Sequence, residues 1–292
     1  MSPKRGKPVV AIVGMGLIGG SLGLAIRKAR IAREVVGICR RPSSIAPAIR
    51  MGACDRGTIR LKQGIDGADL IFLCTPPQEI MRLARVIARQ AEPGVVVTDV
   101  GSTKSLIVRN IESGTPDSFL FVGGHPLAGS EQAGLKASRP GLFRGATWIL
   151  TRSRRTSPKA IASLAKFLSK LRVSIAVMSP QEHDEILALT SHLPHAVAGT
   201  LAGSLKSSHL RFAAGGFKDV TRIASSDPNL WGEIFLSNRH EVADALSRFR
   251  LNLGQVERWI RRGEGRSLVR FLVRARALRE KIHGIGQPSR HD

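Results

Sequence analysis

The sequence predicts an α/β fold in which an N-terminal doubly wound parallel sheet is followed by an all-helical C-terminal domain. Three observations carry this prediction. Apolar runs rich in β-branched residues alternate with helical segments up to about residue 179, a glycine-rich turn follows the first run, and a strong helix start stands at Ser179. Continuous apolar strands indicate coverage on both faces, and their alternation with helices is typical of a parallel sheet.

Each element follows from its own pattern. Pro8 to Gly14 is a short apolar run, and Leu17 to Arg30 has the spacing of an amphipathic helix. The further expected strands are Glu34–Ile38, Ala68–Cys74, Val95–Val100, Phe119–Val122, Thr147–Thr151 and Val173–Met178, with helices through Met81 and Ile87 and over residues 158–171.

A change of pattern at Ser179 predicts the second domain. The run Ser179-Pro180-Gln181-Glu182 is a capping box with proline at the first helical position, which is a strong helix start. From there to about residue 283 the pattern is helical, with breaks at Gly215-Gly216 and at Ser225 to Asn229. We therefore expect a nucleotide-binding domain over residues 1–179 and a helical domain over residues 180–292.

The chain is strongly basic, with 45 Lys and Arg against 22 Asp and Glu and a formal charge of +23. The excess is spread evenly, aromatic residues make up 4% and Tyr is absent, whereas nucleic-acid-binding surfaces concentrate charge and interleave it with aromatic residues. The composition therefore argues against nucleic acid as a partner. The same positive field would speed the association of a polyanionic small ligand.

The chain carries no sign of export or membrane insertion. No apolar run approaches the ~18 residues that a membrane span needs, and the basic N-terminus lacks the apolar segment and cleavage site of a signal peptide. Cys39, Cys54 and Cys74 have no paired spacing, which fits a reducing compartment. We expect a cytoplasmic protein with no membrane partner.

The glycine-rich turn Gly14-Met15-Gly16-Leu17-Ile18-Gly19 lies between the first strand and the first helix, the context in which it predicts a Rossmann-like dinucleotide site. Gly14 allows the tight turn, Gly16 lets the backbone approach a pyrophosphate, and Gly19 lets helix and strand pack closely. The helix N-terminus, at Leu17 and Ile18, favours phosphate. Residues beyond later strands complete the expected cofactor site: Thr75, Pro76 and Gly101.

The end of the second strand indicates which dinucleotide binds. NAD enzymes usually place Asp or Glu there for the ribose 2′-hydroxyl, but this chain has Cys39 followed by Arg40, Arg41 and, after a proline, Ser43. Two guanidinium groups and nearby hydroxyls suit a 2′-phosphate, and no carboxylate repels it. We therefore expect NADP, with NAD as the lesser alternative. An incidental basic loop in a basic protein is the competing interpretation.

Three further segments carry candidate chemistry. Ser102 follows a strand and opens a helix, which places it at the sheet edge where doubly wound folds bind ligands. His125, in Gly123-Gly124-His125-Pro126, also lies just beyond a strand end and is poorly explained by packing. On the capped helix, Ser191 and His195 are four residues apart and share a face, with Pro194 bending the helix. His192 points elsewhere, where we expect it to satisfy a local hydrogen bond.

Together these segments resemble the prephenate dehydrogenase family, which includes arogenate and dual-specificity cyclohexadienyl dehydrogenases. The resemblance runs from Val10 to about Ile282. Its most specific parts are His125 to Gly134, Ser191-His192-Leu193-Pro194-His195, Gly215-Gly216-Phe217-Lys218-Asp219-Val220-Thr221-Arg222 and Asp227-Pro228-Asn229-Leu230-Trp231. The order of these phrases is more specific than the glycine turn alone.

The resemblance implies oxidative decarboxylation of prephenate to 4-hydroxyphenylpyruvate, a step of tyrosine biosynthesis, by a homodimer. It assigns His125 as the catalytic histidine that receives the hydroxyl proton, and an imidazole suits that role near neutral pH. Ser102 matches the serine that bridges substrate, histidine and nicotinamide. The matching substrate-site positions are Ser191, His195, Arg222, Asp219, Trp231 and Glu131, of which Arg222 grips a substrate carboxylate and His195 orients the substrate.

Other functions stay open at this point. His195 fits acceptance of prephenate, but dual-specificity relatives share it, so an arogenate-specific enzyme is an alternative. β-Hydroxyacid dehydrogenases generally use a lysine on a helix, and Ser179 to Leu205 contains none. A zinc site from His183, His192 and His195 lacks a carboxylate at metal spacing, so we expect no metal. A non-catalytic NADP-sensing or nucleic-acid-binding protein is the remaining alternative.

Overall fold

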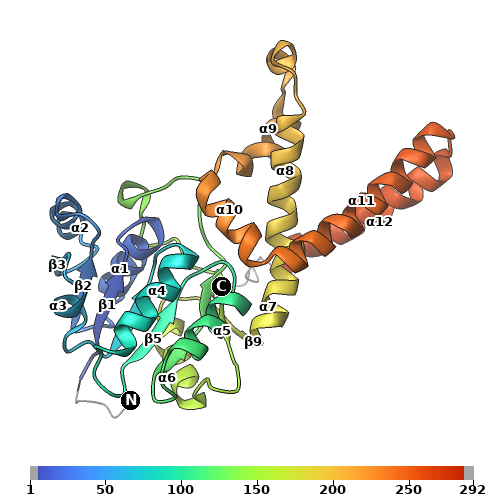
Figure 1. The fold of residues 1–292 in the computed structure, drawn as a ribbon. Helices are drawn as coiled ribbons and strands as arrows, with labels where there is room; N and C mark the ends of the chain where they lie inside the picture. The colour runs from blue at the N-terminus through green and yellow to red at the C-terminus, as the bar shows by residue number, and fades with distance from the viewer. Residues whose placement is uncertain (1–5, 286–292) are drawn as a thin grey trace, which may run out of the picture. The chain divides into compact units, whose positions relative to one another are not determined.

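The computed structural model describes residues 6–285 (Figure 1). Residues 1–5, which begin the N-terminal segment considered above against a signal peptide, and residues 286–292 lie outside that range. The chain divides into two compact units, Met1–Val242 and Ala243–Asp292, which are described separately. The expected domain boundary at residues 179 and 180 stays a prediction.

A six-stranded sheet forms the centre of the first unit. Its strands are β1 (Val9–Val13), β2 (Glu34–Ile38), β3 (Arg56–Thr58), β4 (Leu70–Leu73), β5 (Val96–Asp99) and β6 (Leu120–Val122). They lie in the order β3-β2-β1-β4-β5-β6, and every neighbouring pair is parallel. The predicted α/β fold class is confirmed. The strand order reverses between β1 and β4, so ligands are expected beyond the carboxyl ends of those strands.

Helices cover both faces of this sheet, as the continuous apolar runs predicted. The side chains of Val10 and Ile12 point into one core with α1 (Leu17–Ala29), α2 (Ile45–Arg50) and α6 (Pro158–Ser169). Those of Val9 and Val13 point into the other core, with α3 (Leu61–Ile65), α4 (Pro77–Ala88) and α5 (Ser105–Gly114). Because alternate residues serve opposite faces, a strand buried on both faces must be apolar throughout.

A second, three-stranded sheet was not foreseen as a separate element. It has the order β7-β8-β9, in which β7 (Gly124–Pro126) is antiparallel to β8 (Thr147–Thr151) and β8 is parallel to β9 (Ser174–Met178). The expected strands at 147–151 and 173–178 therefore exist but do not extend the main sheet. None of the short elements β7, β3, α2 and α3 contains a long apolar run, so the sequence pattern did not predict them.

The capped helix at Ser179 forms as predicted and then changes its winding. The Glu182 amide donates to Ser179 Oγ over 3.1 Å at the start of α7 (Pro180–Leu187). A π-turn over Ala188–His192 separates it from α8 (Leu193–Gly203). Pro194 gives a reason, because a proline ring clashes with the carbonyl four residues earlier and a wider turn makes room.

The rest of the helical region consists of short elements. α9 (Gly215–Thr221) begins at the glycine pair that we expected to be a break, because the interruption lies earlier, at residues 204–214. The break before α10 (Pro228–Ser237) is confirmed, and the Asp227 side chain caps that helix. Short 3₁₀ turns occur at Pro42–Ser44, Leu135–Ala137, Ser207–Phe212 and Arg222–Ser225.

The second unit is a helical hairpin. It contains most of α11 (Arg239–Arg261) and α12 (Gly265–Ile285), which are joined at Gly263, where φ is +66°. The rings of Trp259 and Phe271 lie 6.1 Å apart between the two helices. Large apolar side chains are nevertheless at least half exposed, namely Leu251, Leu253, Ile260, Val269, Leu272, Val273, Leu278 and Ile282. Within residues 6–285, no helix combines the length and the apolar character that crossing a membrane requires.

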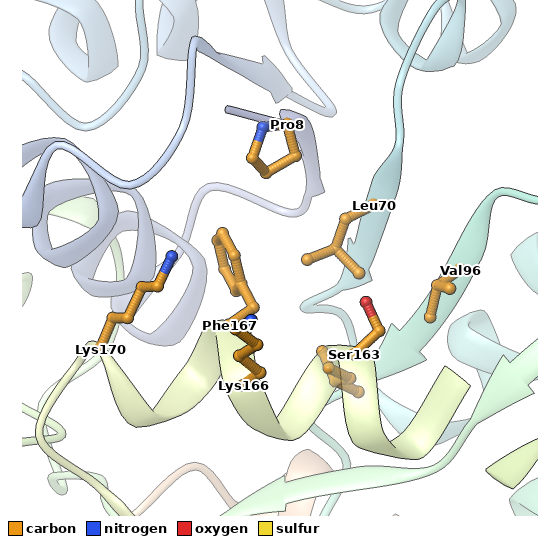
Figure 2. Close-up of a pocket in the computed structure, with 8 residues that line it drawn as sticks. Pro8, Leu70, Val96, Ser163, Lys166, Phe167 and Lys170 are labelled. Carbon is orange, nitrogen blue, oxygen red and sulfur yellow. The ribbon is translucent and has the colours of Figure 1, made fainter. Parts of the chain in front are cut away.

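A small apolar cavity of about 150 Å³ lies at the amino-terminal edge of the main sheet (Figure 2). Its lining includes Pro8, Leu70 and Val96, which precede or begin their strands, and Phe167 of α6. This edge is opposite the carboxyl ends of the strands. The cavity is therefore a packing gap on the far side of the sheet from the expected ligand site.

Asp99, the last residue of β5, forms a buried network that joins three segments. Its carboxylate accepts hydrogen bonds from the amides of Gly101 (2.8 Å) and Gly124 (2.9 Å) and pairs with the ammonium group of Lys104. Both charged side chains have no exposed surface. A buried charge without its partner is strongly unfavourable, so each ion holds the other in place.

We predict that Lys104→Met lowers the free energy of unfolding by ~3–5 kcal/mol, because it leaves the Asp99 carboxylate buried without a counter-charge. Urea unfolding followed by circular dichroism measures this difference. The double variant Lys104→Met/Asp99→Asn is the control, and it should recover part of the loss. A single variant as stable as the parent protein would show that this pair does not hold the network.

Candidate active site

The glycine turn has the geometry that the sequence predicted. Gly14 has a φ of +98°, and a Cβ there would lie 2.4 Å from the carbonyl oxygen of Cys74. A Cβ on Gly19 would lie 2.0 Å from the carbonyl oxygen of Gly14, so helix and turn meet too closely for a side chain. At Gly16, by contrast, a Cβ would meet no atom of the protein within 4 Å. The turn therefore packs closely against the protein at Gly14 and Gly19, and its backbone is open at Gly16.

The open side of this turn fits a dinucleotide. α1 has no side-chain cap, so the amides at Leu17 and Ile18 in its first turn are free for a ligand. Thr75 lies against Gly14, and its Oγ1 is buried without a hydrogen-bond partner among the described residues. An open backbone approach, free amides and an unpaired hydroxyl are features that a bound cofactor would satisfy. Pro76 and Gly101 follow the ends of β4 and β5 on the same edge.

The predicted 2′-phosphate loop lies next to the glycine turn. The Gly14 amide donates to the Ile38 carbonyl over 2.9 Å, which ties the turn to the end of β2. Cys39 is 4% exposed, so its thiol cannot replace the usual acidic residue. Arg40, Arg41 and Ser43 are exposed, and in the described part of the chain neither arginine forms an ion pair or side-chain hydrogen bond.

Ser102 and His125 are brought together through their neighbours. Asp99 binds the amides of Gly101 and Gly124, and each of these glycines directly precedes one of the two candidate catalytic residues. Ser102 then follows β5 at the carboxyl edge, while His125 lies on β7. Along that edge the order is β2, β1, β4, β5, so the basic loop and the two candidate catalytic residues lie at opposite ends of the expected cofactor path.

His125 is buried, with 8% of its surface exposed, and one of its ring nitrogens is engaged. Nδ1 lies 2.8 Å from Nε2 of His183. Nε2 has no partner among the described residues and is not one of the buried unpaired atoms, so it keeps contact with solvent. Burial lowers the pKa of His125 well below its ordinary value, and His183 and Lys104 lower it further. The imidazole is therefore a neutral base at pH 7.

His195 and Trp231 form a stacked pair at the start of α8. Their ring centroids are 3.5 Å apart with an interplanar angle of 9°, and Phe235 meets His195 edge-on. Burial lowers the pKa of His195, and its Nδ1 is buried without a partner in the described part of the chain. Ser191 lies on the π-turn, half-buried, with no hydrogen bond from its hydroxyl among residues 6–285.

His192 faces the protein interior and has a structural contact. Its Nδ1 lies 3.2 Å from Nδ2 of Asn238, and burial lowers its pKa to about 4. His192 therefore has a hydrogen-bond partner, but not the local one that we expected, because Asn238 lies 46 positions away in the sequence. His192 also meets Trp231 edge-on, at 6.2 Å between ring centroids, so the histidines at 192 and 195 share an aromatic neighbour.

Arg222 and Glu131 pair with each other. Arg222 Nη1 lies 3.0 Å from Glu131 Oε2, and the two side chains are 60% and 34% exposed. An ion pair this exposed contributes at most about 1 kcal/mol. Asp219, one turn before Arg222, is exposed and forms no hydrogen bond or ion pair with the described residues. The structure thus joins two of these three predicted residues and leaves the third apart.

Several buried polar residues around His125 were not singled out by sequence reasoning. His183 had been considered only as a zinc ligand, and its ring bonds His125 instead. Asp184, Lys104, Asp99 and Asn238 were missed, because their partners lie far away in the sequence. One signal was available: α5 begins at Ser105 without a capping side chain of its own, so a distant acceptor was needed.

Family models match most of the chain. A model described as "Prephenate dehydrogenase, nucleotide-binding domain" matches residues 22–177, and one described as "Prephenate dehydrogenase, dimerization domain" matches residues 179–274. The first match begins after the glycine turn. Two relatives are the prephenate dehydrogenase of Bacillus subtilis, 32% identical over 94% of this chain and 76% of that protein, and the cyclohexadienyl dehydrogenase of Zymomonas mobilis, 34% identical over 88% and 89%.

Solved structures agree with these matches. The chain is similar to the crystal structure of prephenate dehydrogenase from Aquifex aeolicus in complex with hydroxyphenyl propionate and NAD+, with a TM-score of 0.88, 32% identity and coverage of 96% of this chain and 99% of that one. It is also similar to Synechocystis arogenate dehydrogenase, with a TM-score of 0.79, 30% identity and coverage of 94% and 99%.

The contrast between Gly16 and Gly19 gives a prediction. Gly16→Ala should leave the melting temperature unchanged but weaken dinucleotide binding by ~10-fold or more, since the added methyl group occupies the approach to the backbone. Gly19→Ala should lower the melting temperature, because its Cβ meets a backbone oxygen. Differential scanning fluorimetry and fluorescence titration with NADP and NAD measure both effects. Unchanged nucleotide affinity in Gly16→Ala would contradict the assignment.

Proposed function

The chain belongs to the prephenate dehydrogenase family, and from this premise we propose that it oxidatively decarboxylates prephenate with NADP as the preferred hydride acceptor. The observation that carries the proposal is the state of His125: a neutral, buried imidazole with one free nitrogen at the sheet edge where the cofactor turn opens. The bound nicotinamide ring supplies the acceptor for the hydride, which leaves the ring carbon that bears the hydroxyl group.

In this proposal His125 Nε2 accepts the proton of the substrate hydroxyl as the carbonyl develops. Its lowered pKa keeps the ring unprotonated at neutral pH, so Nε2 is available to accept this proton. Ser102 orients the hydroxyl, and the Asp99 carboxylate binds the residue before Ser102 and the residue before His125. Loss of the ring carboxylate as carbon dioxide then completes the aromatic ring, because its electron pair moves through the ring to the carbonyl oxygen, which takes the proton back from His125 as the phenol forms.

Arg222 holds the pyruvyl carboxylate in this proposal. A strong ion pair with the departing ring carboxylate would stabilise the ground state and oppose decarboxylation, so the arginine is better placed on the side chain. Its exposed pair with Glu131 is weak enough for a substrate carboxylate to replace it at little cost. His195, with an unpaired buried Nδ1 beside Trp231, and Ser191 offer polar contacts for the rest of the substrate.

The preference for NADP rests on the loop after β2. Arg40 and Arg41 are exposed without carboxylate partners in the described residues, and the buried Cys39 leaves no acidic group beside them. We further propose a cytoplasmic homodimer. The exposed apolar side chains of α11 and α12 support a partner subunit, since monomers rarely leave so many apolar groups in water.

The proposed activity is tested by measuring kcat/KM for prephenate and for arogenate, each with NADP and with NAD. We expect turnover of prephenate with NADP as the highest value. A higher kcat/KM for arogenate would identify arogenate as the preferred substrate. No turnover in any of the four combinations would overturn the proposal.

Two variants test the roles of the site residues. His125→Asn should lower kcat by ~10²–10⁴-fold because the general base is lost. Arg222→Ala should mainly raise KM for prephenate, by ~10–100-fold, because a charge-assisted contact to a carboxylate is lost. Steady-state kinetics at pH 7 separate the two effects. The reverse pattern, with kcat lost in Arg222→Ala and KM raised in His125→Asn, would contradict the assignment.

Arg41→Ala should raise KM for NADP by ~10-fold or more and leave KM for NAD nearly unchanged. The matched control is Arg33→Ala, an exposed arginine that precedes β2 at the opposite edge of the sheet and should change neither value. Equal effects of the two substitutions would show that overall charge, and not a 2′-phosphate contact, sets the cofactor affinity.

A further inference from the structure

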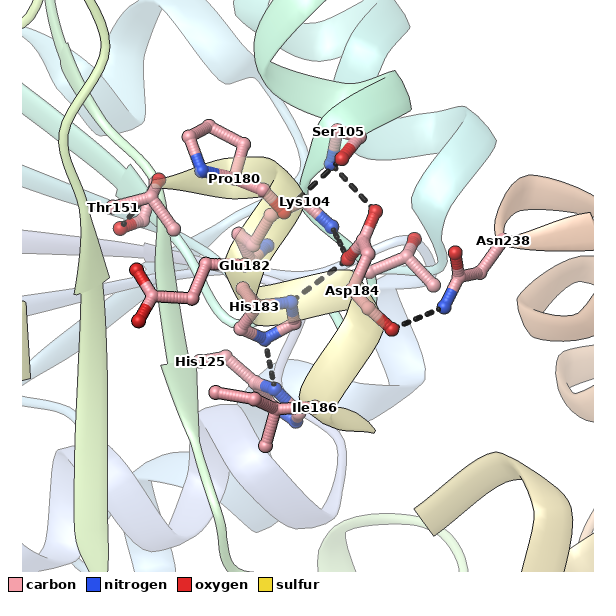
Figure 3. Close-up of polar contacts among 12 residues, drawn as sticks. Lys104, Ser105, His125, Thr151, Pro180, Glu182, His183, Asp184, Ile186 and Asn238 are labelled. Carbon is pink, nitrogen blue, oxygen red and sulfur yellow. Dashed lines mark hydrogen bonds and ion pairs between the residues drawn. The ribbon is translucent and has the colours of Figure 1, made fainter. Parts of the chain in front are cut away.

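A line of buried polar groups runs from the start of α5 to His125, and the proposed reaction gives it no role so far. His183 and Asp184 are 0% and 2% exposed, and both lie on α7 (Figure 3). Figure 3 shows the contacts in sequence: Lys104 and Ser105 meet Asp184, Asp184 meets His183, and His183 meets His125.

The Asp184 carboxylate is fixed as an acceptor. Its Oδ1 accepts from the Lys104 amide at 2.7 Å, and its Oδ2 accepts from the Ser105 amide at 2.8 Å, so it caps α5 from a distant helix. Burial alone would raise the pKa of Asp184, but the hydrogen bonds from His183 and from these two amides lower it below its ordinary value. An ionised carboxylate at a helix N-terminus can only accept hydrogen bonds.

This acceptor determines the position of every proton along the line. Asp184 Oδ1 lies 2.8 Å from His183 Nδ1, so Nδ1 carries a hydrogen and donates it. In a neutral ring, His183 Nε2 then has the lone pair and accepts from His125 Nδ1 across 2.8 Å. His125 consequently carries its hydrogen on Nδ1, and its Nε2 presents a lone pair at the site.

We propose that His183 and Asp184 are positioning residues that hold His125 in the tautomer with a free Nε2 and share the proton it receives. The inference rests on the proposed function, in which His125 accepts the hydroxyl proton. When that proton arrives at His125 Nε2, the Nδ1 proton can pass to His183 Nε2. His125 is then neutral again, and the positive charge lies on His183 beside the Asp184 carboxylate.

The surrounding charges are consistent with this arrangement. Burial lowers the pKa of both His125 and His183, and the Lys104 ammonium group lowers it further, although Lys104 is paired with Asp99 in the same buried region; the hydrogen bond from His183 to Asp184 acts in the opposite direction. His192, on the following π-turn, is neutral because burial lowers its pKa to about 4. Asn238 donates to the Asp184 carbonyl at 2.9 Å and so holds α7 in position without adding charge. Asp184 therefore supplies the negative charge that stabilises a protonated His183.

Two substitutions at His183 separate positioning from packing. His183→Asn is too short to accept from His125, and we expect kcat to fall by ~10²-fold or more while KM for prephenate changes less than about threefold. His183→Gln places an amide oxygen near the position of Nε2, so it should retain kcat within about tenfold of the parent enzyme. Melting temperature and NADP affinity are measured for both. Equal losses of kcat in the two variants, or no loss in His183→Asn, would overturn the proposal.

A second measurement does not depend on turnover. Long-range ¹H–¹⁵N NMR of histidine-labelled protein without substrate distinguishes protonated from unprotonated ring nitrogens, and His125→Asn identifies the signals of His125. We expect a neutral ring with the hydrogen on Nδ1 at pH 7, and a mixture of tautomers in His183→Asn. A hydrogen on Nε2 in the parent protein would overturn the proposal. If the tautomer is as expected but prephenate is not turned over, the proposed function fails, while the assignment of His183 and Asp184 as residues that fix the tautomer of His125 stands.

Discussion

The buried carboxylate of Asp99 is the interaction on which the arrangement of the site depends. It binds the backbone on two sides, at Gly101 after β5 and at Gly124 at the start of β7, and Lys104 balances its charge. The main sheet and the small sheet are connected in the chain through Gly123, between β6 and β7, and the Asp99 carboxylate adds a directional contact between β5 and β7. Because backbone amides are the donors, the carboxylate sets the spacing between Ser102 and His125 without using either side chain.

A second buried carboxylate, that of Asp184 in the helical region, also accepts hydrogen bonds from two backbone amides. Asp184 on α7 closes the start of α5 and at the same time orients His183. One group therefore connects a helix end of the nucleotide-binding part with the histidine pair at the site. The two acidic side chains that organise the site, Asp99 and Asp184, are both buried. In the protein interior, hydrogen bonds to ions are stronger than in water, and an unpaired ion is most unfavourable.

Sequence patterns predicted the elements that carry long apolar runs or strong caps. Glu34–Ile38 and Thr147–Thr151 form strands with those bounds, and the capping box at Ser179 starts a helix. The glycine turn could be predicted because Gly14 and Gly19 leave no room for a side chain, while Gly16 keeps the backbone open to a ligand. The three-residue strand at Gly124–Pro126 could not be predicted, because its pairing partner lies on β8 and nothing in its own composition requires a strand.

The polar network around His125 was beyond sequence reasoning for a related reason. A cap contributed from 79 or 80 positions away leaves no periodic signal, and a buried Lys or Asp looks like any surface charge until its partner is known. His125 was singled out by its place just beyond a strand end, whereas Arg222 was found through a resemblance of short phrases. Their roles remain predictions, while the contacts that position His125 come from the structure.

The π-turn at Ala188–His192 has a consequence for how one helix serves two neighbours. A regular α-helix advances about 100° per residue, so Asp184 and His195, eleven positions apart, would point in nearly the same direction. The wider turn holds one residue more and sets the following segment back by about that angle. α7 can thus direct Asp184 and His183 toward α5 and β7, while α8 presents His195 to Trp231. Removing a single residue from this turn would rotate α8 by about 100° relative to α7, so that His183 and Asp184 could not keep their contacts while His195 kept its contact with Trp231.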